Sequence, residues 1–152
     1  MADLYLLVIA LAALGLAIGS WFRPVSNTKA PTAPNYTNQR VAEAKANVCA
    51  AFRTVHQAIT VTNHREHGND PTSTLAAATS ARQAFAAGSV YLMTSLSDEP
   101  ATPPDLAHAV RGLATVFQQL TVTYLAELSD SALDPLLHAG DEATLTIEQL
   151  CK

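Results

Sequence analysis

The stretch VAEAKANVCAAFRTVHQAITVT, residues 41–62, determines the fold class predicted for this chain. Its apolar residues recur every three or four positions, which is the spacing of one face of an α-helix. The period extends the predicted helix over about Asn38 to His67, where Gly68 supplies a C-terminal stop. The helical face consists of Val41, Ala44, Val48, Phe52, Val55, Ile59 and Thr62.

The same period continues through the next segment of the chain. Asp70 followed by Pro71 is typical of an N-cap and the first helical residue, so a second helix is predicted from there to about Ser97. Its predicted apolar face consists of Leu75, Ala78, Phe85, Leu92 and Leu96.

Two further helices are predicted after the loop SDEPATPP. Thr102 and Asp105 resemble a capping box, with Pro103 and Pro104 in the first turn of a third helix that ends near Leu128. After a short turn beyond Asp130, a fourth helix is predicted for about Pro135 to Leu150. The third and fourth helices carry Leu106, Val110, Leu113, Phe117, Leu120 and Tyr124, and Leu136, Ala143, Ile147 and Leu150, on their apolar faces. Residues 37–152 are therefore predicted to form an all-α, small antiparallel helical bundle.

The N-terminal segment predicts a different environment. Residues 4–22 contain no charged side chain and would span roughly 28 Å as a helix, close to the hydrocarbon thickness of a bilayer. Aromatic side chains at both ends suit the two membrane interfaces. We predict one transmembrane anchor over residues 1–23 and a Pro/Thr-rich linker over residues 24–36. A cleaved signal peptide is the alternative, because Ala17 and Gly19 have the spacing that signal peptidase prefers, but the basic n-region is missing.

The predicted anchor also carries a candidate binding surface. Gly15 and Gly19 form a Gly-x-x-x-Gly motif, and Ala12 lies nearly one turn earlier on the same side. Small residues on one face let two membrane helices approach closely and gain dispersion contacts. We expect this face to bind a membrane helix of a partner, although Gly and Ala are also common in membrane helices without such a role.

Two features of the sequence favour opposite sides of the membrane for the folded domain. Arg23 and Lys29 follow the apolar run, which by the positive-inside rule places the folded domain in the cytoplasm. The only two cysteines, Cys49 and Cys151, favour the opposite side, because a single pair joining distant segments suits an oxidising compartment. We favour an extracytoplasmic domain on a single-pass plasma-membrane protein, with Cys49 and Cys151 as a disulfide. Two unpaired thiols are the alternative.

Catalytic and cofactor motifs are absent from the sequence. His64 and His67 share a helical face and are a weak candidate for two zinc ligands. A solvated last helical turn, in which His and Arg interact with the helix dipole, explains the same residues, and we favour it. No phosphate-binding glycine motif or nucleophile elbow occurs, so no cofactor and no enzyme activity are expected. The net charge of −4 provides no electrostatic footprint for nucleic acid.

The layout resembles small single-pass envelope proteins of the mycobacterial type. The resemblance is carried by the residue 4–22 helix, the linker over 24–36, NVCAAF around Cys49 and the terminal EQLCK. Some proteins of this type are accessory subunits of large envelope machines, and the resemblance implies such a role in an Mce lipid transporter.

Two functions of different classes follow as hypotheses. The first is a non-enzymatic accessory subunit that docks on a polytopic membrane complex and stabilises it. Its anchor would contact both this complex and the membrane lipid. An Mce-type lipid transporter ranks first as that complex, and a respiratory supercomplex is the alternative. A tethered module that binds a lipid or another small ligand is a hypothesis of a different class.

Overall fold

The computed structural model describes residues 35–63, 70–127 and 129–152. These residues form four α-helices and no strand: α2 (Asn38–Asn63), α3 (Pro71–Asp98), α4 (Pro104–Leu125) and α5 (Asp130–Leu150). The residues from Tyr36 onward make up one compact unit. The prediction of an all-helical bundle is thus confirmed. None of these four helices is long and apolar enough to cross a membrane, and the predicted anchor lies outside the described residues.

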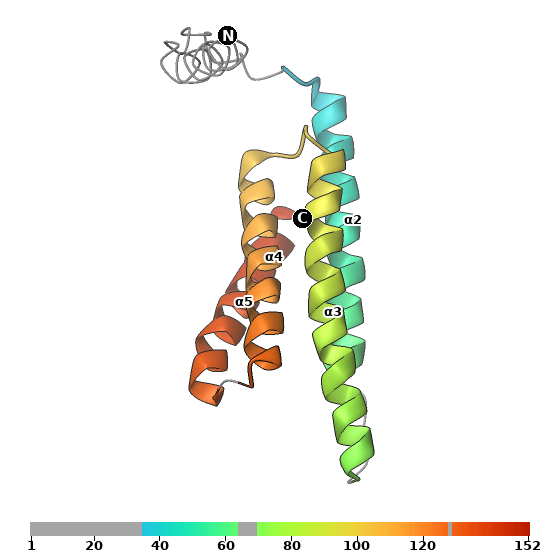
Figure 1. Cartoon of the computed structure of the whole chain (residues 1–152). Coiled ribbons are helices and arrows are strands. Elements are labelled where there is room, and N and C mark those ends of the chain that lie inside the picture. The colour runs from blue at the N-terminus through green and yellow to red at the C-terminus, as the bar shows by residue number, and fades with distance from the viewer. Residues whose placement is uncertain (1–34, 64–69, 128) are drawn as a thin grey trace, which may run out of the picture. The chain divides into compact units, whose positions relative to one another are not determined.

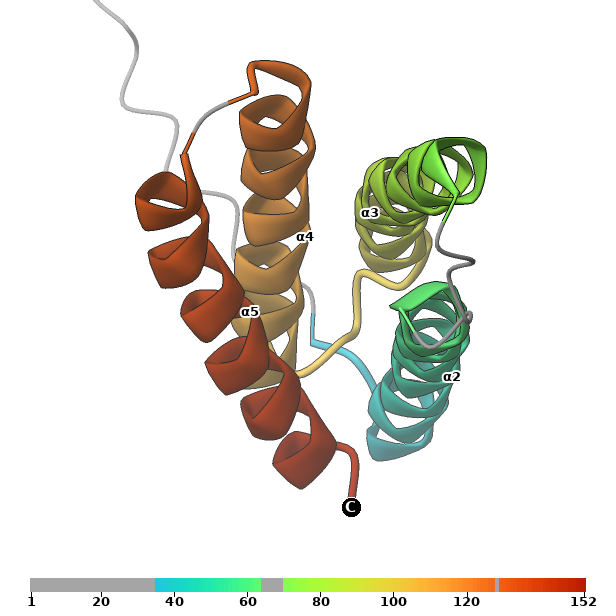
Figure 2. The same ribbon diagram turned by 90° about the horizontal axis from the view of Figure 1, so that it is seen from below.

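The four helices run alternately up and down (Figure 1). α2 packs along α3, α3 along α4 and α4 along α5, whereas direct contact between α2 and α5 is sparse. Seen from below, the four helices stand around a common centre, with α2 and α3 beside each other and α4 and α5 opposite them (Figure 2). The packing is therefore serial along the chain, as short helix–helix loops favour.

The core lies where the apolar faces of the four helices meet. Its buried members come mostly from α2, α3 and α4: Val48, Cys49, Phe52, Val55, Phe85, Leu92, Leu96, Leu106, Val110, Leu113, Ala114, Phe117 and Leu120. α5 contributes the buried Leu133 and Ile147, and its Leu136, Ala143 and Leu150 are partly buried against the core. α5 therefore buries fewer apolar side chains than the other three helices, and its position depends more on other contacts.

α2 and α3 approach closely at Gly88. A Cβ atom added at Gly88 would lie 2.7 Å from Cγ1 of Val55, which is buried on α2. Val is stiff at χ1 in a helix, so Val55 has little freedom to move away. The absence of a side chain at Gly88 therefore sets how near α2 and α3 can lie.

A polar contact fastens the loop between α3 and α4 to α2. Oε1 of Glu99 accepts a hydrogen bond of 2.5 Å from Nδ2 of Asn47, and Oε2 lies 2.9 Å from Nη2 of Arg40. The side chain of Glu99 is only 13% exposed, so this ion pair is less screened than a surface pair. Both Asn47 and Arg40 lie on α2, so these contacts join α2 to the loop between α3 and α4.

The first turn of α3 is capped as the sequence predicts. Oδ1 of Asp70 accepts hydrogen bonds of 3.0 Å from the backbone amides of Thr72 and Ser73. The bonds from the Ser73 amide and hydroxyl are the main reason why the pKa of Asp70 lies below its ordinary value. Pro71 occupies the first helical position, where its missing N–H costs no hydrogen bond.

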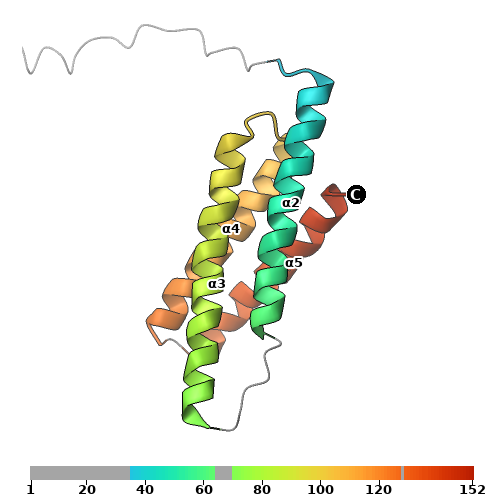
Figure 3. The same ribbon diagram turned by 90° about the vertical axis from the view of Figure 1, so that its right-hand side faces the viewer.

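Three details of the predicted helices are wrong. Leu75, expected on the apolar face, is 64% exposed, because the first turns of α3 project beyond the ends of the other helices (Figures 1 and 3). Thr102 does not form a capping box: its hydroxyl donates to the carbonyl of Glu99, and Pro103 occupies the N-cap position of α4. α5 begins at Asp130 and includes Pro135, because tertiary packing overrides the local helix-breaking preference of proline.

Adding a methyl group at Gly88 should destabilise the bundle relative to the same change at Gly112. Both substitutions to Ala gain helix propensity, but only Gly88→Ala forces a contact with Val55, whereas nothing lies within 4 Å of a Cβ at Gly112. We expect the free energy of unfolding of Gly88→Ala to be lower than that of Gly112→Ala by roughly 1–3 kcal/mol, the usual cost of overpacking. Chemical denaturation followed by circular dichroism measures the difference, and equal stabilities would contradict the close approach.

The cap at Asp70 should make stability depend on acid pH. Because its pKa is lower in the folded state, its contribution is complete above the unfolded pKa of about 3.9 and is lost as the pH falls through the folded pKa. Asp70→Asn keeps a capping oxygen but cannot titrate. We expect the difference in Tm between the native chain and Asp70→Asn to shrink from about pH 7 to about pH 2.5. A difference that stays constant over this range would refute the assignment.

Candidate functional site

Most of the site residues predicted from the sequence lie outside the described ranges. Ala12, Gly15 and Gly19 of the predicted anchor are among them, as are His64 and His67. The membrane-helix face and the histidine pair therefore stay predictions. The described site residues are Cys49 and Cys151.

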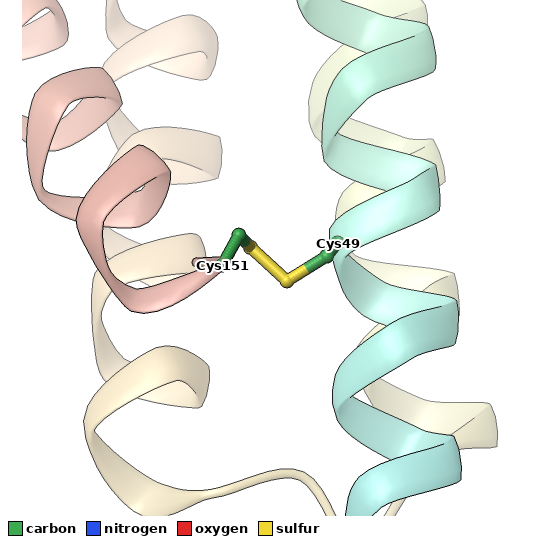
Figure 4. The surroundings of a disulfide bond; sticks show 2 residues. All are labelled: Cys49 and Cys151. Carbon is green, nitrogen blue, oxygen red and sulfur yellow. A yellow bond between two sulfur atoms is a disulfide. The ribbon is translucent and has the colours of Figure 1, made fainter.

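Cys49 and Cys151 are joined across the bundle. Cys49 is buried in the N-terminal half of α2, and Cys151 is the C-cap residue of α5. Their Cα atoms are 5.7 Å apart, within the usual range for a disulfide, and their sulfur atoms are bonded (Figure 4). The bond spans 102 positions of sequence and links the first described helix to the last. The predicted pairing of the two cysteines agrees with the structure.

Beyond this bond, α2 and α5 are separated by a cleft. The floor of this α2–α5 cleft is apolar and comes from Ile59, Phe85, Phe117 and Leu120. Its rims consist of His56 and Thr60 on α2, and of Leu137, Asp141 and Thr144 on α5, and the buried Gly140 of α5 also lines it. The aromatic floor is held in place by a tilted Phe85–Phe117 pair with ring centroids 5.4 Å apart.

The dimensions of the cleft limit what it can hold. Its volume is about 180 Å³, whereas pockets for drug-sized ligands have roughly 300–1,000 Å³. An apolar floor with a polar rim is the arrangement that accepts a buried anchor side chain at protein interfaces. The α2–α5 cleft is thus better suited to one large side chain of a partner than to a free ligand.

A second, larger depression lies where the first turns of α3 extend past the neighbouring helices. This distal hollow has a volume of about 340 Å³. It is lined by Thr62 of α2, by Thr74, Ala77, Ala78, Ala81 and Arg82 of α3, and by Tyr124 of α4. The ring of Tyr124 stacks on Phe85 with centroids 6.3 Å apart, so its position is fixed by the core.

The remaining histidines are dispersed. His56, His108 and His138 are exposed and lie on α2, α4 and α5 respectively. Within residues 35–63, 70–127 and 129–152, no group of three or more His, Cys, Asp or Glu side chains is arranged to hold a metal ion. The ring of His56 stacks on Phe52 with centroids 5.7 Å apart, which gives this histidine a packing role at the cleft rim.

Sequence reasoning missed both depressions. The α2–α5 cleft depends on how far two helices at opposite ends of the chain diverge, and no local pattern encodes that distance. The distal hollow had a weak signal, because Arg82 lies three residues before the core residue Phe85 and follows a run of small residues. A charged residue on that side of a helix indicates either a partner or an opening to solvent.

Removing the disulfide should destabilise the bundle strongly. Cys49→Ser together with Cys151→Ser frees α5, which has the thinnest buried face, and raises the conformational entropy of the unfolded chain by removing the covalent loop. We expect the free energy of unfolding to fall by about 2–5 kcal/mol, as is typical for the loss of a native disulfide. Denaturation of the full chain in detergent with and without reductant measures the loss.

The double serine variant is the control for this measurement. Reductant should lower the stability of the native chain and leave that of the variant unchanged. A native chain whose stability is the same before and after complete reduction would show that the bond contributes nothing.

Comparisons of the chain with models of protein families, with curated proteins and with solved structures found no match.

Proposed function

We propose that this chain is a membrane-anchored, non-enzymatic accessory subunit that docks on a larger complex of the cell envelope and stabilises it. The observation that carries the proposal is the α2–α5 cleft, an apolar and aromatic depression between two helices that a disulfide joins near the C-terminal end of α5. A partner side chain inserted there would contact all four helices. Such a contact would use a shape that the bundle presents without rearrangement.

The proposed location is the plasma membrane, with a single span and an extracytoplasmic domain. The apolar run over residues 4–22 supports the anchor. The Cys49–Cys151 pair supports an oxidising compartment, because such bonds persist mainly outside the cytoplasm. Arg23 and Lys29 argue for the opposite orientation, and we give the disulfide more weight, since it closes a large part of the fold.

Two surfaces would make the docking contact. In the membrane, the face formed by Ala12, Gly15 and Gly19 would pack against a helix of a polytopic partner. Outside the membrane, the α2–α5 cleft would receive an anchor side chain from the same complex. Two linked contacts of moderate strength bind more tightly together than either does alone.

The identity of the complex rests on resemblance. The anchor, the linker and the placement of the two cysteines are similar to those of small mycobacterial-type envelope proteins, which favours an Mce-type lipid transporter. A respiratory supercomplex ranks second. Neither choice affects the physical argument for docking.

The docking proposal predicts that two variants lose co-purification with the partner complex. Gly15→Leu with Gly19→Leu would block close approach of membrane helices, and Thr144→Trp would fill the α2–α5 cleft. We expect each to reduce the recovered complex at least tenfold after affinity purification from crosslinked native membranes, since a lost interface anchor costs about 2 kcal/mol or more.

Thr146→Trp is the matched control, because Thr146 is exposed on the same helix and does not line the cleft. It should leave the recovered complex unchanged. Full recovery with the Gly15/Gly19 variant would refute docking through the membrane helix. Full recovery with a folded Thr144→Trp variant would refute docking through the cleft.

The distal hollow favours a second candidate function, a tethered module that binds a lipid or another small ligand. Its volume of about 340 Å³ falls within the range of small-ligand pockets, and most of its lining is apolar. Native mass spectrometry of the detergent-extracted chain tests it, since a retained ligand without protein partners is the expected result.

A further inference from the structure

Arg82 carries a positive charge that the described part of the bundle does not neutralise. Its Nε atom is inaccessible to solvent and has no hydrogen-bond partner among the described residues. The contrast with Arg40 is informative, because Arg40 lies 2.9 Å from Glu99 and 3.9 Å from Glu43. Buried donors are normally satisfied, so an unsatisfied one on a guanidinium needs an explanation.

The surroundings of Arg82 show where a counter-ion could lie. Its side chain is partly buried and lines the distal hollow beside Ala77, Ala78 and Ala81. The alanine side chains form an apolar surface next to Arg82, the one cationic side chain among the described residues that line the hollow. A group that neutralised Arg82 there would therefore be in contact with apolar surface as well.

Few other polar groups in the hollow are available to a ligand as donors. The hydroxyl of Thr62 donates to the carbonyl of Ala58, and that of Thr74 donates to the carbonyl of Asp70. The phenol of Tyr124 has no hydrogen-bond partner within the described ranges, and its ring is held against Phe85. Among the described residues, the hollow thus offers the guanidinium of Arg82 and the phenol of Tyr124 to a ligand.

We propose that the distal hollow binds an amphiphile with a single anionic head, a carboxylate or a phosphate, on an apolar tail. The two Nη atoms of the planar Arg82 guanidinium can donate paired hydrogen bonds to such a head, and the Tyr124 hydroxyl adds one donor. The tail lies against the alanines of α3. This inference rests on the second candidate function, the tethered ligand-binding module, and specifies the chemistry of its ligand.

The overall charge of the chain does not favour the binding of anions. The net charge is −4, so the protein as a whole does not attract anions. Binding of an anionic amphiphile therefore reports a local cation rather than a general field. The volume of about 340 Å³ is at the lower end for small-ligand pockets, which suits a short tail or the first part of a longer one.

The test titrates octanoate and octyl phosphate into the isotope-labelled full chain in phosphatidylcholine nanodiscs, followed by the amide resonances of Ala77, Ala78 and Ala81. We expect saturable shifts with at least one of the two anions, and the one that binds identifies the head group. Arg82→Gln should weaken binding at least tenfold, as expected for the loss of charge-assisted hydrogen bonds. Arg111→Gln, which removes an exposed arginine of α4 that does not line the hollow, should leave the affinity unchanged.

Ala77→Leu provides a second variant, because it fills the hollow and keeps the charge of Arg82. It should also abolish saturable binding. An affinity of folded Arg82→Gln within twofold of the native value would overturn the proposal, as would an unchanged affinity of Ala77→Leu. Either result would place the binding elsewhere.

Octanol separates this inference from the candidate function on which it rests. If octanol binds as tightly as octanoate and Arg82→Gln leaves the affinity for octanol unchanged, the requirement for an anionic head is refuted. A module that binds an apolar ligand would still be supported. If none of the three probes shows saturable shifts and native mass spectrometry finds no retained ligand, both are refuted. The docking proposal is unaffected by either result, since co-purification tests it.

Discussion

The Cys49–Cys151 disulfide closes a chain of helices that otherwise pack mainly in sequence order. α2 contacts α3, α3 contacts α4, and α4 contacts α5, while α2 and α5 share little direct contact. The covalent bond holds the end of α5 against α2 and leaves the two helices free to diverge beyond it. The α2–α5 cleft exists because this seam is joined near one end and is not packed along its length. The proposed docking surface therefore lies on the seam that the bond closes at one place.

A second constraint acts between α2 and α3. The missing side chain of Gly88 allows Val55 to approach, and these two long helices lie close together as a result. α3 also extends past its neighbours at its N-terminal end (Figure 3), so that Leu75 is exposed and Arg82 lines a hollow instead of a packed interface. The two depressions thus have different origins. One comes from diverging helices, and the other comes from unequal helix lengths.

Local signals in the sequence predicted helix starts only where no tertiary contact competed with them. The start of α3 could be predicted because Asp70 and Pro71 act within one turn of backbone. The start of α5 could not be predicted, because proline disfavours a helix interior locally. Packing of Leu133 against the core favours the earlier start and outweighs this preference of Pro135. Thr102 failed as a cap for a similar reason: its hydroxyl had a competing acceptor, the carbonyl of Glu99, that the spacing of residues does not reveal.

The sequence by itself determined the helical class, the approximate extent of the helices and the presence of two cysteines that could pair. These properties depend on periodicity and composition, which act over a few turns or are counted directly. Only the tertiary structure decided that α2 and α5 separate beyond the disulfide, that α3 projects past its neighbours, and that Arg82 has no counter-ion among the described residues. The physical reason is distance along the chain. The two surfaces are formed by residues from three or four different helices, and their spacing results from packing rather than from any local preference.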